Sequence, residues 1–240
     1  DLNTDGIDPS GRDVWIHDCY VRNDDDSIAV KPTHAGGKYS ACSEDMLIED
    51  TTLVGMGASI GSVPPNDDHN CVRNITFRNI SMPHTGKGVY IKSNPECAAD
   101  GSKTAEITDI LYENIAITNP LWWPVWIGPQ QQHEPDWTPA RAAEDCSLAY
   151  PFVDNCPTQA CVTFTNITLR DVRIVDPLFS PGVILGNQTA AGNTITGLVF
   201  DGVSVVNPGT LPFSAAFMCE YADGTAINSS LAPACLKSRR

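Results

Sequence analysis

Acidic residues cluster at two places near the start of the chain, about twenty residues apart. Asp5 stands in the run Asn3-Thr4-Asp5-Gly6, and the triplet Asp24-Asp25-Asp26 follows it. Carboxylates held close together repel one another, so a folded chain keeps them together for acid–base chemistry, for a metal or as a solvated turn. If one carboxyl keeps its proton while another is ionised, the cluster supplies an acid and a base.

A calcium site is the first alternative, because residues 1–6 match the start of an EF-hand loop. That loop requires a bidentate glutamate at its twelfth position, where this chain has Arg12. The flanking sequence also lacks helical periodicity. We therefore expect no bound metal and no cofactor.

The elements that must position the acidic residues are short strands. Hydrophobic residues make up 42% of the 240 residues and charged residues 18%, with 18 glycines and 18 prolines, which favours a turn-rich β protein. No apolar run is long enough to span a membrane, so we expect no membrane partner. The net charge of −14 argues against a nucleic-acid partner.

The nine cysteines, none in a CxxC pair, and five Asn-x-Ser/Thr sequons favour an oxidising compartment. We expect a secreted, extracellular, monomeric protein. Its opening residues contain no signal peptide, and one cysteine is left over, so we expect that N-terminal coils are missing. Cys219 is expected to pair with Cys235, and one more disulfide is expected among Cys146, Cys156 and Cys161.

Two families of short strands recur along the chain. Members of the first family carry Asp, Asn or Gly at the centre, which indicates a bend. The first family begins at Trp15, Leu47, Thr76, Leu111, Thr168 and Val199, and the second at Ile28, Ala58, Val89, Val125 and Val183. Both families make one long step at the same place, which predicts an insertion near 129–161.

Repeats of about thirty residues with several strands each are typical of a β-solenoid, whereas the blades of a β-propeller usually need about 40 or more residues. We therefore expect one all-β solenoid domain over residues 1–240, ending in a disulfide-rich tail. The strand phase also places four residues in one column along a groove, namely Asp5, Asp26, Met56 and Lys87. Tyr90 and Lys92 follow on the same strand as the last of these.

Four motifs in this order resemble glycoside hydrolase family 28, the polygalacturonase and rhamnogalacturonan hydrolase family. They are Asn3-Thr4-Asp5-Gly6, Asn23-Asp24-Asp25-Asp26, the run at 55–62, and Gly88-Val89-Tyr90-Ile91-Lys92. The resemblance implies a right-handed parallel β-helix that hydrolyses a pectic polysaccharide with inversion.

By that resemblance, Asp25 is the general acid, and Asp5 and Asp26 activate the attacking water. Inversion implies a separation of roughly 6.5–9.5 Å between the acid and base carboxyl groups. The substrate-binding residues are expected to be Asn3, Lys87, Tyr90 and Lys92.

Two residues depart from the family pattern, because Met56 replaces its usual histidine and Tyr90 its usual arginine. Without that arginine the site lacks a bidentate clamp for a sugar carboxylate. A neutral or branched sugar, as in rhamnogalacturonan-type hydrolases, is therefore expected beside Tyr90. A non-catalytic carbohydrate-binding β-helix and an adhesin-like structural solenoid are the alternatives from other classes.

Aromatic residues could either pack or stack on sugar rings. Trp126 alternates with Val125 and Ile127 and is expected in the solenoid core. For Tyr90 and for Trp122, Trp123 and Trp137, both possibilities stay open.

Overall fold

The structure is a computed structural model that describes residues 3–33, 42–64, 70–93, 97, 104–133, 146–152 and 156–239. Part of the predicted insertion, and Trp137 within it, lie outside these residues. The described part contains strands and no helix that could cross a membrane. The strands of one long sheet are β1 (Arg12–His17), β2 (Tyr20–Arg22), β4 (Cys42–Val54), β6 (Asn70–Pro83), β8 (Ala105–Thr118), β12 (Val162–Val175), β16 (Ile195–Asp201), β17 (Ser204–Val206), β19 (Ala222–Ile227) and β20 (Lys237–Arg239).

A second sheet contains β3 (Ile28–Val30), β5 (Ala58–Val63), β7 (Val89–Ser93), β9 (Val125–Gln130), β13 (Gly182–Leu185) and β18 (Phe217–Glu220). Two small ribbons are formed by β10 (Gln132–His133) with β11 (Cys146–Ser147) and by β14 (Gln188–Thr189) with β15 (Gly192–Asn193).

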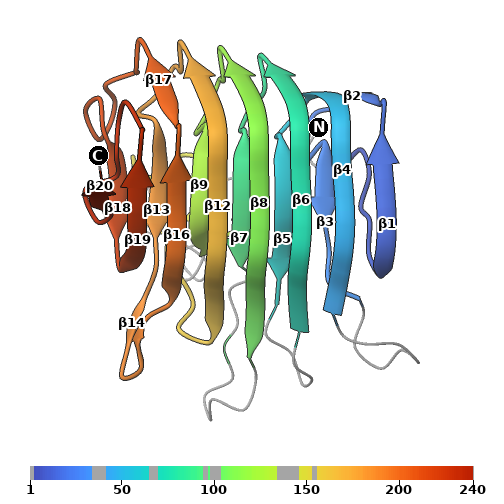
Figure 1. Cartoon of the computed structure of the whole chain (residues 1–240), viewed down its shortest axis with the longest axis horizontal. Coiled ribbons are helices and arrows are strands. Elements are labelled where there is room, and N and C mark those ends of the chain that lie inside the picture. Colours follow the sequence, from blue (N-terminus) through green and yellow to red (C-terminus); the bar gives the residue numbers. More distant parts are fainter. Residues whose placement is uncertain are drawn as a thin grey trace.

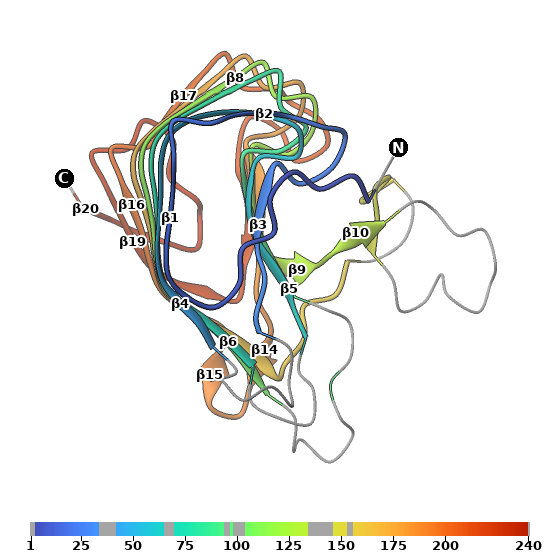
Figure 2. The ribbon, with the colours of Figure 1, turned by 90° about the vertical axis from the view of Figure 1, so that its right-hand side faces the viewer.

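Both long sheets are parallel, and each contains one strand from nearly every turn of the chain. Figure 1 shows the turns stacked side by side from the N-terminal to the C-terminal end. Figure 2 looks along this stack and shows successive turns superposed, with the two sheets on different sides of the coil. The predicted right-handed parallel β-helix is confirmed.

The predicted phase of the first strand family is confirmed residue by residue. Leu47 pairs with Trp15 on one side and with Thr76 on the other, and Thr168 pairs with Leu111. The second family needs one correction, because Val125 pairs with Gly182 and not with Val183. A slip of one residue exchanges the two faces of a strand, so Val183 lies on the outer face.

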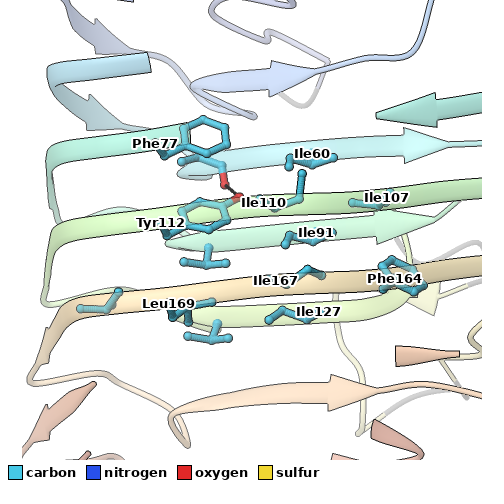
Figure 3. Close-up of a cluster of buried hydrophobic side chains, with 14 of the residues drawn as sticks. Ile60, Phe77, Ile91, Ile107, Ile110, Tyr112, Ile127, Phe164, Ile167 and Leu169 are labelled. Carbon is cyan, nitrogen blue, oxygen red and sulfur yellow. Dashed lines mark hydrogen bonds between the residues drawn. The ribbon is translucent and has the colours of Figure 1, made fainter. Parts of the chain in front are cut away.

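The core lies between the two sheets and consists of apolar ladders. Figure 3 shows Ile60, Ile91 and Ile127 in a file along the second sheet, facing side chains of the first. The rings of Phe77 and Tyr112 stack with centroids 4.7 Å apart. Fully burying one such side chain stabilises the fold by about 1.5–3 kcal/mol, and each turn repeats the contribution.

The centre of each first-family repeat is a corner in the left-handed backbone region, as the predicted bends require. Asp50, Asn79 and Asn114 have φ values of 51°, 55° and 53°. Asn and Asp tolerate this conformation better than other residues with a side chain. Asn79 also donates a hydrogen bond to Asp50 (3.0 Å) and accepts one from Asn114 (2.8 Å), so the corners form a polar ladder.

Disulfides hold several turns together. The predicted Cys219–Cys235 bond is present, and Cys146 pairs with Cys156. Two further bonds, Cys42–Cys71 and Cys97–Cys161, were not predicted. Cys19 has no disulfide partner among the described residues.

Candidate active site

The segment that carries Asp5 lies directly on the turn that carries Asp26. Ile7 forms a parallel bridge with Ile28, and the Gly6 N–H donates to the Asp26 carbonyl at 2.9 Å. A Cβ atom on Gly6 would lie 2.5 Å from the Ser27 carbonyl oxygen, so only glycine allows this approach. The two acidic motifs are therefore neighbours on adjoining turns.

Asn23 joins the two motifs through its side-chain amide. Its Nδ2 lies within hydrogen-bond distance of the carbonyl oxygens of Thr4 (3.0 Å), Asp25 (2.9 Å) and Asp26 (2.9 Å). Its Oδ1 accepts a hydrogen bond from Ser27 Oγ at 3.0 Å. Asn23 was not predicted as a site residue, although an asparagine directly before the acidic triplet is a usable signal, because its amide carries both donors and acceptors.

Asp25 is half-buried, and both of its oxygens accept backbone hydrogen bonds. Oδ2 accepts the Asn3 N–H at 2.5 Å, and Oδ1 accepts the Asp26 N–H at 2.8 Å. Asn3 thus reaches Asp25 through its main chain. The Met56 N–H donates to the Asp25 carbonyl at 2.7 Å, which ties the next turn to the same loop.

Asp26 lies behind these groups and is 1% exposed. Its Oδ1 accepts a hydrogen bond from Ser59 Oγ at 2.8 Å, and its Oδ2 lies 2.5 Å from Lys92 Nζ. Lys92 is equally buried. The pair therefore forms an ion pair shielded from water, in which each charge depends on the other.

Asp5 has a different environment that is partly open to solvent. Lys31 Nζ lies 3.3 Å from Asp5 Oδ2 and 3.9 Å from Asp8 Oδ2. Partial burial raises the pKa of Asp8, and the neighbouring Asp5 acts in the same direction, while Lys31 opposes them. Asp8 was not predicted beside Asp5, because a spacing of three residues places two side chains on opposite faces of a regular strand.

Lys87, Tyr90 and Lys92 form a buried layer beside Asp26. Lys87 Nζ lies 3.7 Å from the Tyr90 ring centroid, and Lys92 Nζ lies 4.4 Å from it. Lys87 Nζ has no hydrogen-bond partner among the described residues. Burial lowers the pKa of Lys87 well below its ordinary value, and the nearby Lys92 adds to this, so the uncharged amine is favoured.

Tyr90 is 2% exposed, and its hydroxyl accepts the Gln132 N–H at 3.1 Å. Burial raises the pKa of Tyr90 well above its ordinary value. Its ring packs within the wall, with Lys87 and Lys92 against it. Among the predicted site residues, Asn3, Asp5 and Asp25 reach the surface, whereas Asp26, Lys87, Tyr90 and Lys92 lie beneath it.

The prediction that Trp126 fills the solenoid core was wrong. Val125 and Ile127 point into the core, and Trp126 lies between them in sequence, so it points to the outer face, as alternation in a strand requires. Trp126 is nevertheless fully buried there, and Trp123 is 1% exposed. Both tryptophans pack, while Trp122 is half-buried.

This arrangement suits acid–base chemistry. Asp5 is partly open to water, Asp26 is buried with a cation, and Asp25 accepts backbone hydrogen bonds from both motifs, at Asn3 and at Asp26. No group of three or more His, Cys, Asp or Glu side chains in the described part of the chain could hold a metal ion.

Comparisons with known proteins agree with the motifs. Endopolygalacturonase I of Aspergillus niger is 33% identical over 117 residues, which are 48% of this chain and 27% of that protein. Probable rhamnogalacturonase E of Aspergillus flavus is 34% identical over 110 residues, which are 46% of this chain and 20% of that protein. The matched segments thus span about a quarter of these curated relatives.

Among solved structures, endopolygalacturonase I from Stereum purpureum, complexed with two galacturonate molecules, has a TM-score of 0.55 at 18% identity. The likeness covers 99% of this chain and 52% of that one, and it concerns the fold. The family model described as glycosyl hydrolases family 28 matches residues 1–144. Because this match extends over more than half of its 240 residues, the chain belongs to glycosyl hydrolase family 28.

Proposed function

We propose that this chain carries the active site of a secreted, monomeric glycoside hydrolase that cleaves pectic polysaccharides with inversion and without a cofactor. The observation that supports this most directly is the main-chain contact between the two acidic motifs. The Asn3 N–H binds the Asp25 carboxylate, and Gly6 binds the Asp26 carbonyl. The names of the relatives support pectin as the substrate class, and four disulfides support an extracellular location.

In this proposal Asp25 donates a proton to the oxygen of the leaving sugar. Asp5 and Asp26 activate a water molecule that attacks the anomeric carbon from the opposite face as the bond to the leaving oxygen breaks, and one of the two carboxylates accepts the proton of that water. The Asp5 side chain is 24% exposed and is the one that water reaches directly. Asp26 is the second base and lies beneath the surface, where Ser59 and Lys92 bind its carboxylate.

The substrate beside Tyr90 is proposed to be neutral or branched, as in rhamnogalacturonan. Recognition of a sugar carboxylate needs a cation that faces the groove. Lys92 is already paired with Asp26, and Lys87 is fully buried with a lowered pKa. Activity on rhamnogalacturonan should therefore exceed activity on plain polygalacturonate, and equal activity on the two would contradict this assignment.

The central experiment replaces the proposed acid. We expect Asp25→Asn to lower the release of reducing sugar by about 10²–10⁴-fold, the usual contribution of a general acid. Asp24→Asn is the matched control, since Asp24 is the exposed neighbour in the same triplet, and it should keep its activity. NMR of the first product should show the inverted anomer, and an unchanged rate for Asp25→Asn would refute the proposal.

A further inference from the structure

The acidic cluster adjoins the outer face of the second sheet, because Ser59 of β5 donates a hydrogen bond to Asp26. In the proposed function a polysaccharide bound at the cluster would extend across this face from turn to turn. Its outward side chains are in register along five strands, and each is at most 2% exposed. They are Ala29, Ser59, Tyr90, Trp126 and Val183. At the N-terminal end of this face Ser59 lies against Asp26 of the acidic cluster, where Asp5 and Asp25 are partly open to solvent.

Over β7, β9 and β13 the covering groups are aromatic. We call the following six residues the aromatic cover: Trp122, Trp123, Trp126, Tyr150, Phe179 and Phe213. Trp123 stacks on Phe213 with centroids 5.6 Å apart, and Trp126 meets the Tyr150 ring edge-on at 5.9 Å. Trp122 likewise meets Phe179 at 5.0 Å. Trp126 belongs to β9 and the other five rings come from loops, so the cover is part of the packed structure of successive turns.

The described residues between β9 and β12, which are 131–133, 146–152 and 156–161, contact the same face. The backbone N–H of Gln132 donates to the Tyr90 hydroxyl, and its side-chain Nε2 donates to the Ser147 carbonyl at 2.8 Å. β10 and β11 pair in parallel, and the buried Cys146–Cys156 disulfide closes this segment beside Tyr150. Two further backbone hydrogen bonds hold these residues to β7 and β9, from the Gln131 N–H to the Ser93 carbonyl (2.9 Å) and from the Gln130 N–H to the Pro157 carbonyl (3.1 Å).

We infer that the aromatic cover ends the substrate groove at β7, so that a pectic chain enters only from the side of Asp5 and is cleaved near one of its ends. This inference rests on the proposed function. A polymer that lay across the whole face would have to displace rings that pack on one another. Trp123 and Trp126 are buried and the other four rings are half-buried, and such ring pairs are favourable beyond their buried area. A chain end needs no displacement, because it can stop at the wall formed by Tyr90 and Trp126.

The product pattern tests the inference. We expect mono- or disaccharides from the earliest time point and little loss of viscosity for each bond hydrolysed. A rapid fall in viscosity, with products of intermediate length, would overturn the inference and leave the proposed hydrolysis intact.

Two variants test whether the cover is the cause. Tyr150→Ala removes one ring, and the double variant Cys146→Ser/Cys156→Ser releases the covering segment. Either change should lengthen the products and speed the loss of viscosity. Cys219→Ser/Cys235→Ser, which removes a disulfide outside the cover, is the matched control and should keep the short products. If both opened variants fold and keep the short products, the cover does not limit the groove.

Binding separates this inference from the proposed function. For Asp25→Asn, titration calorimetry with pectic oligosaccharides of increasing length should show an affinity that rises until the closed end is reached. Beyond that length, each added sugar should change the affinity by less than about threefold, where tenfold equals 1.4 kcal/mol. Affinity that keeps rising with length would overturn the inference. Length-limited binding without hydrolysis by the native chain would refute only the proposed function, and neither binding nor hydrolysis would refute both.

Discussion

Lys92 and Asp26 form a buried ion pair across two turns of the helix, with Nζ and Oδ2 2.5 Å apart although the two residues are 66 positions apart in sequence. The side chains are 3% and 1% exposed. A lysine that the motif predicts to bind sugar is thus paired with a buried carboxylate of the acidic cluster in the fold. Any change at Lys92 should therefore also affect the integrity of the acidic cluster.

Breaking this pair should destabilise the protein strongly. Lys92→Met leaves the Asp26 carboxylate buried without its cation, and removing one partner of a buried pair typically costs about 3–5 kcal/mol. Urea denaturation measures the loss in the free energy of unfolding. The double variant Lys92→Met/Asp26→Asn should lose less than the sum of the two single changes.

The exposed pair between Arg170 and Glu113 provides the control. Its Nη1–Oε1 distance is 3.1 Å, with side chains 45% and 28% exposed. Exposed pairs contribute about 0–1 kcal/mol, so Arg170→Met should have a small effect. Equal losses for Arg170→Met and Lys92→Met would contradict the shielding of the Asp26 pair.

Lys87 should make the stability of the protein depend on pH. Its pKa in the folded state lies below the ordinary value of 10.5, so the unfolded chain binds more protons between these two values. The wild type therefore loses stability as the pH falls from about 10 towards the lowered pKa, by up to about 1.4 kcal/mol per pH unit. Lys87→Met removes this loss, and its advantage in melting temperature should grow from pH 10 to pH 7.

Lys87→Arg is the informative contrast. A guanidinium group keeps its charge in proteins, so this variant should be less stable than the wild type at every pH tested. A constant difference between the wild type and Lys87→Met across the range would show that Lys87 has no lowered pKa.

Asp8 should give a pH dependence of the opposite sign. Its pKa in the folded state is raised above 3.8, so the folded protein holds this proton more tightly than the unfolded chain does. Stability from this group is present below pH 3.8 and is lost as the pH rises through the raised value. Compared with the wild type, Asp8→Asn should therefore melt relatively higher at pH 7 than at pH 3, as calorimetry can measure. The same difference at both values would contradict the shift.

The corner ladder should be sensitive to backbone conformation. Asn114 has φ 53° and donates to Asn79. Asn114→Ala should lower the free energy of unfolding by about 1–2 kcal/mol, because alanine is strained in the left-handed region. Asn114→Gly removes the same hydrogen bond without that strain and should cost less. Chemical denaturation compares the two, and a larger loss for glycine would contradict the conformational explanation.

Much of the fold could be predicted from the sequence, because a parallel β-helix repeats the same alternation on each turn. The alignment of Trp15 with Leu47 and of Leu47 with Thr76 could be predicted because each strand carries its own alternation of apolar and polar residues. The phase failed by one residue at Val183, where apolar side chains occupy both faces and alternation no longer distinguishes them. The same ambiguity misplaced Trp126.

The sequence predicted which residues of the candidate site align from turn to turn, but it did not predict which of them are buried. Strand phase placed Asp5 next to Asp26 and Lys87 along the same column, but burial depends on what covers the sheet. That cover comes from loops with no repeat, including Tyr150 and Phe213, and from contacts such as Gln132 to Tyr90. Side-chain partners such as Ser59 and Lys31 also depend on rotamers that spacing does not specify.

The long step from β8 to β12 has a consequence for the evolution of such proteins. Twelve residue pairs keep their register across this step, from Val162 with Ala105 to Val175 with Thr118, although it is 57 residues long. Loop length and stacking geometry are therefore independent variables in this fold. Evolution can lengthen or replace the segment between β9 and β12, and so change which substrates the groove admits, without changing the register of any strand pair.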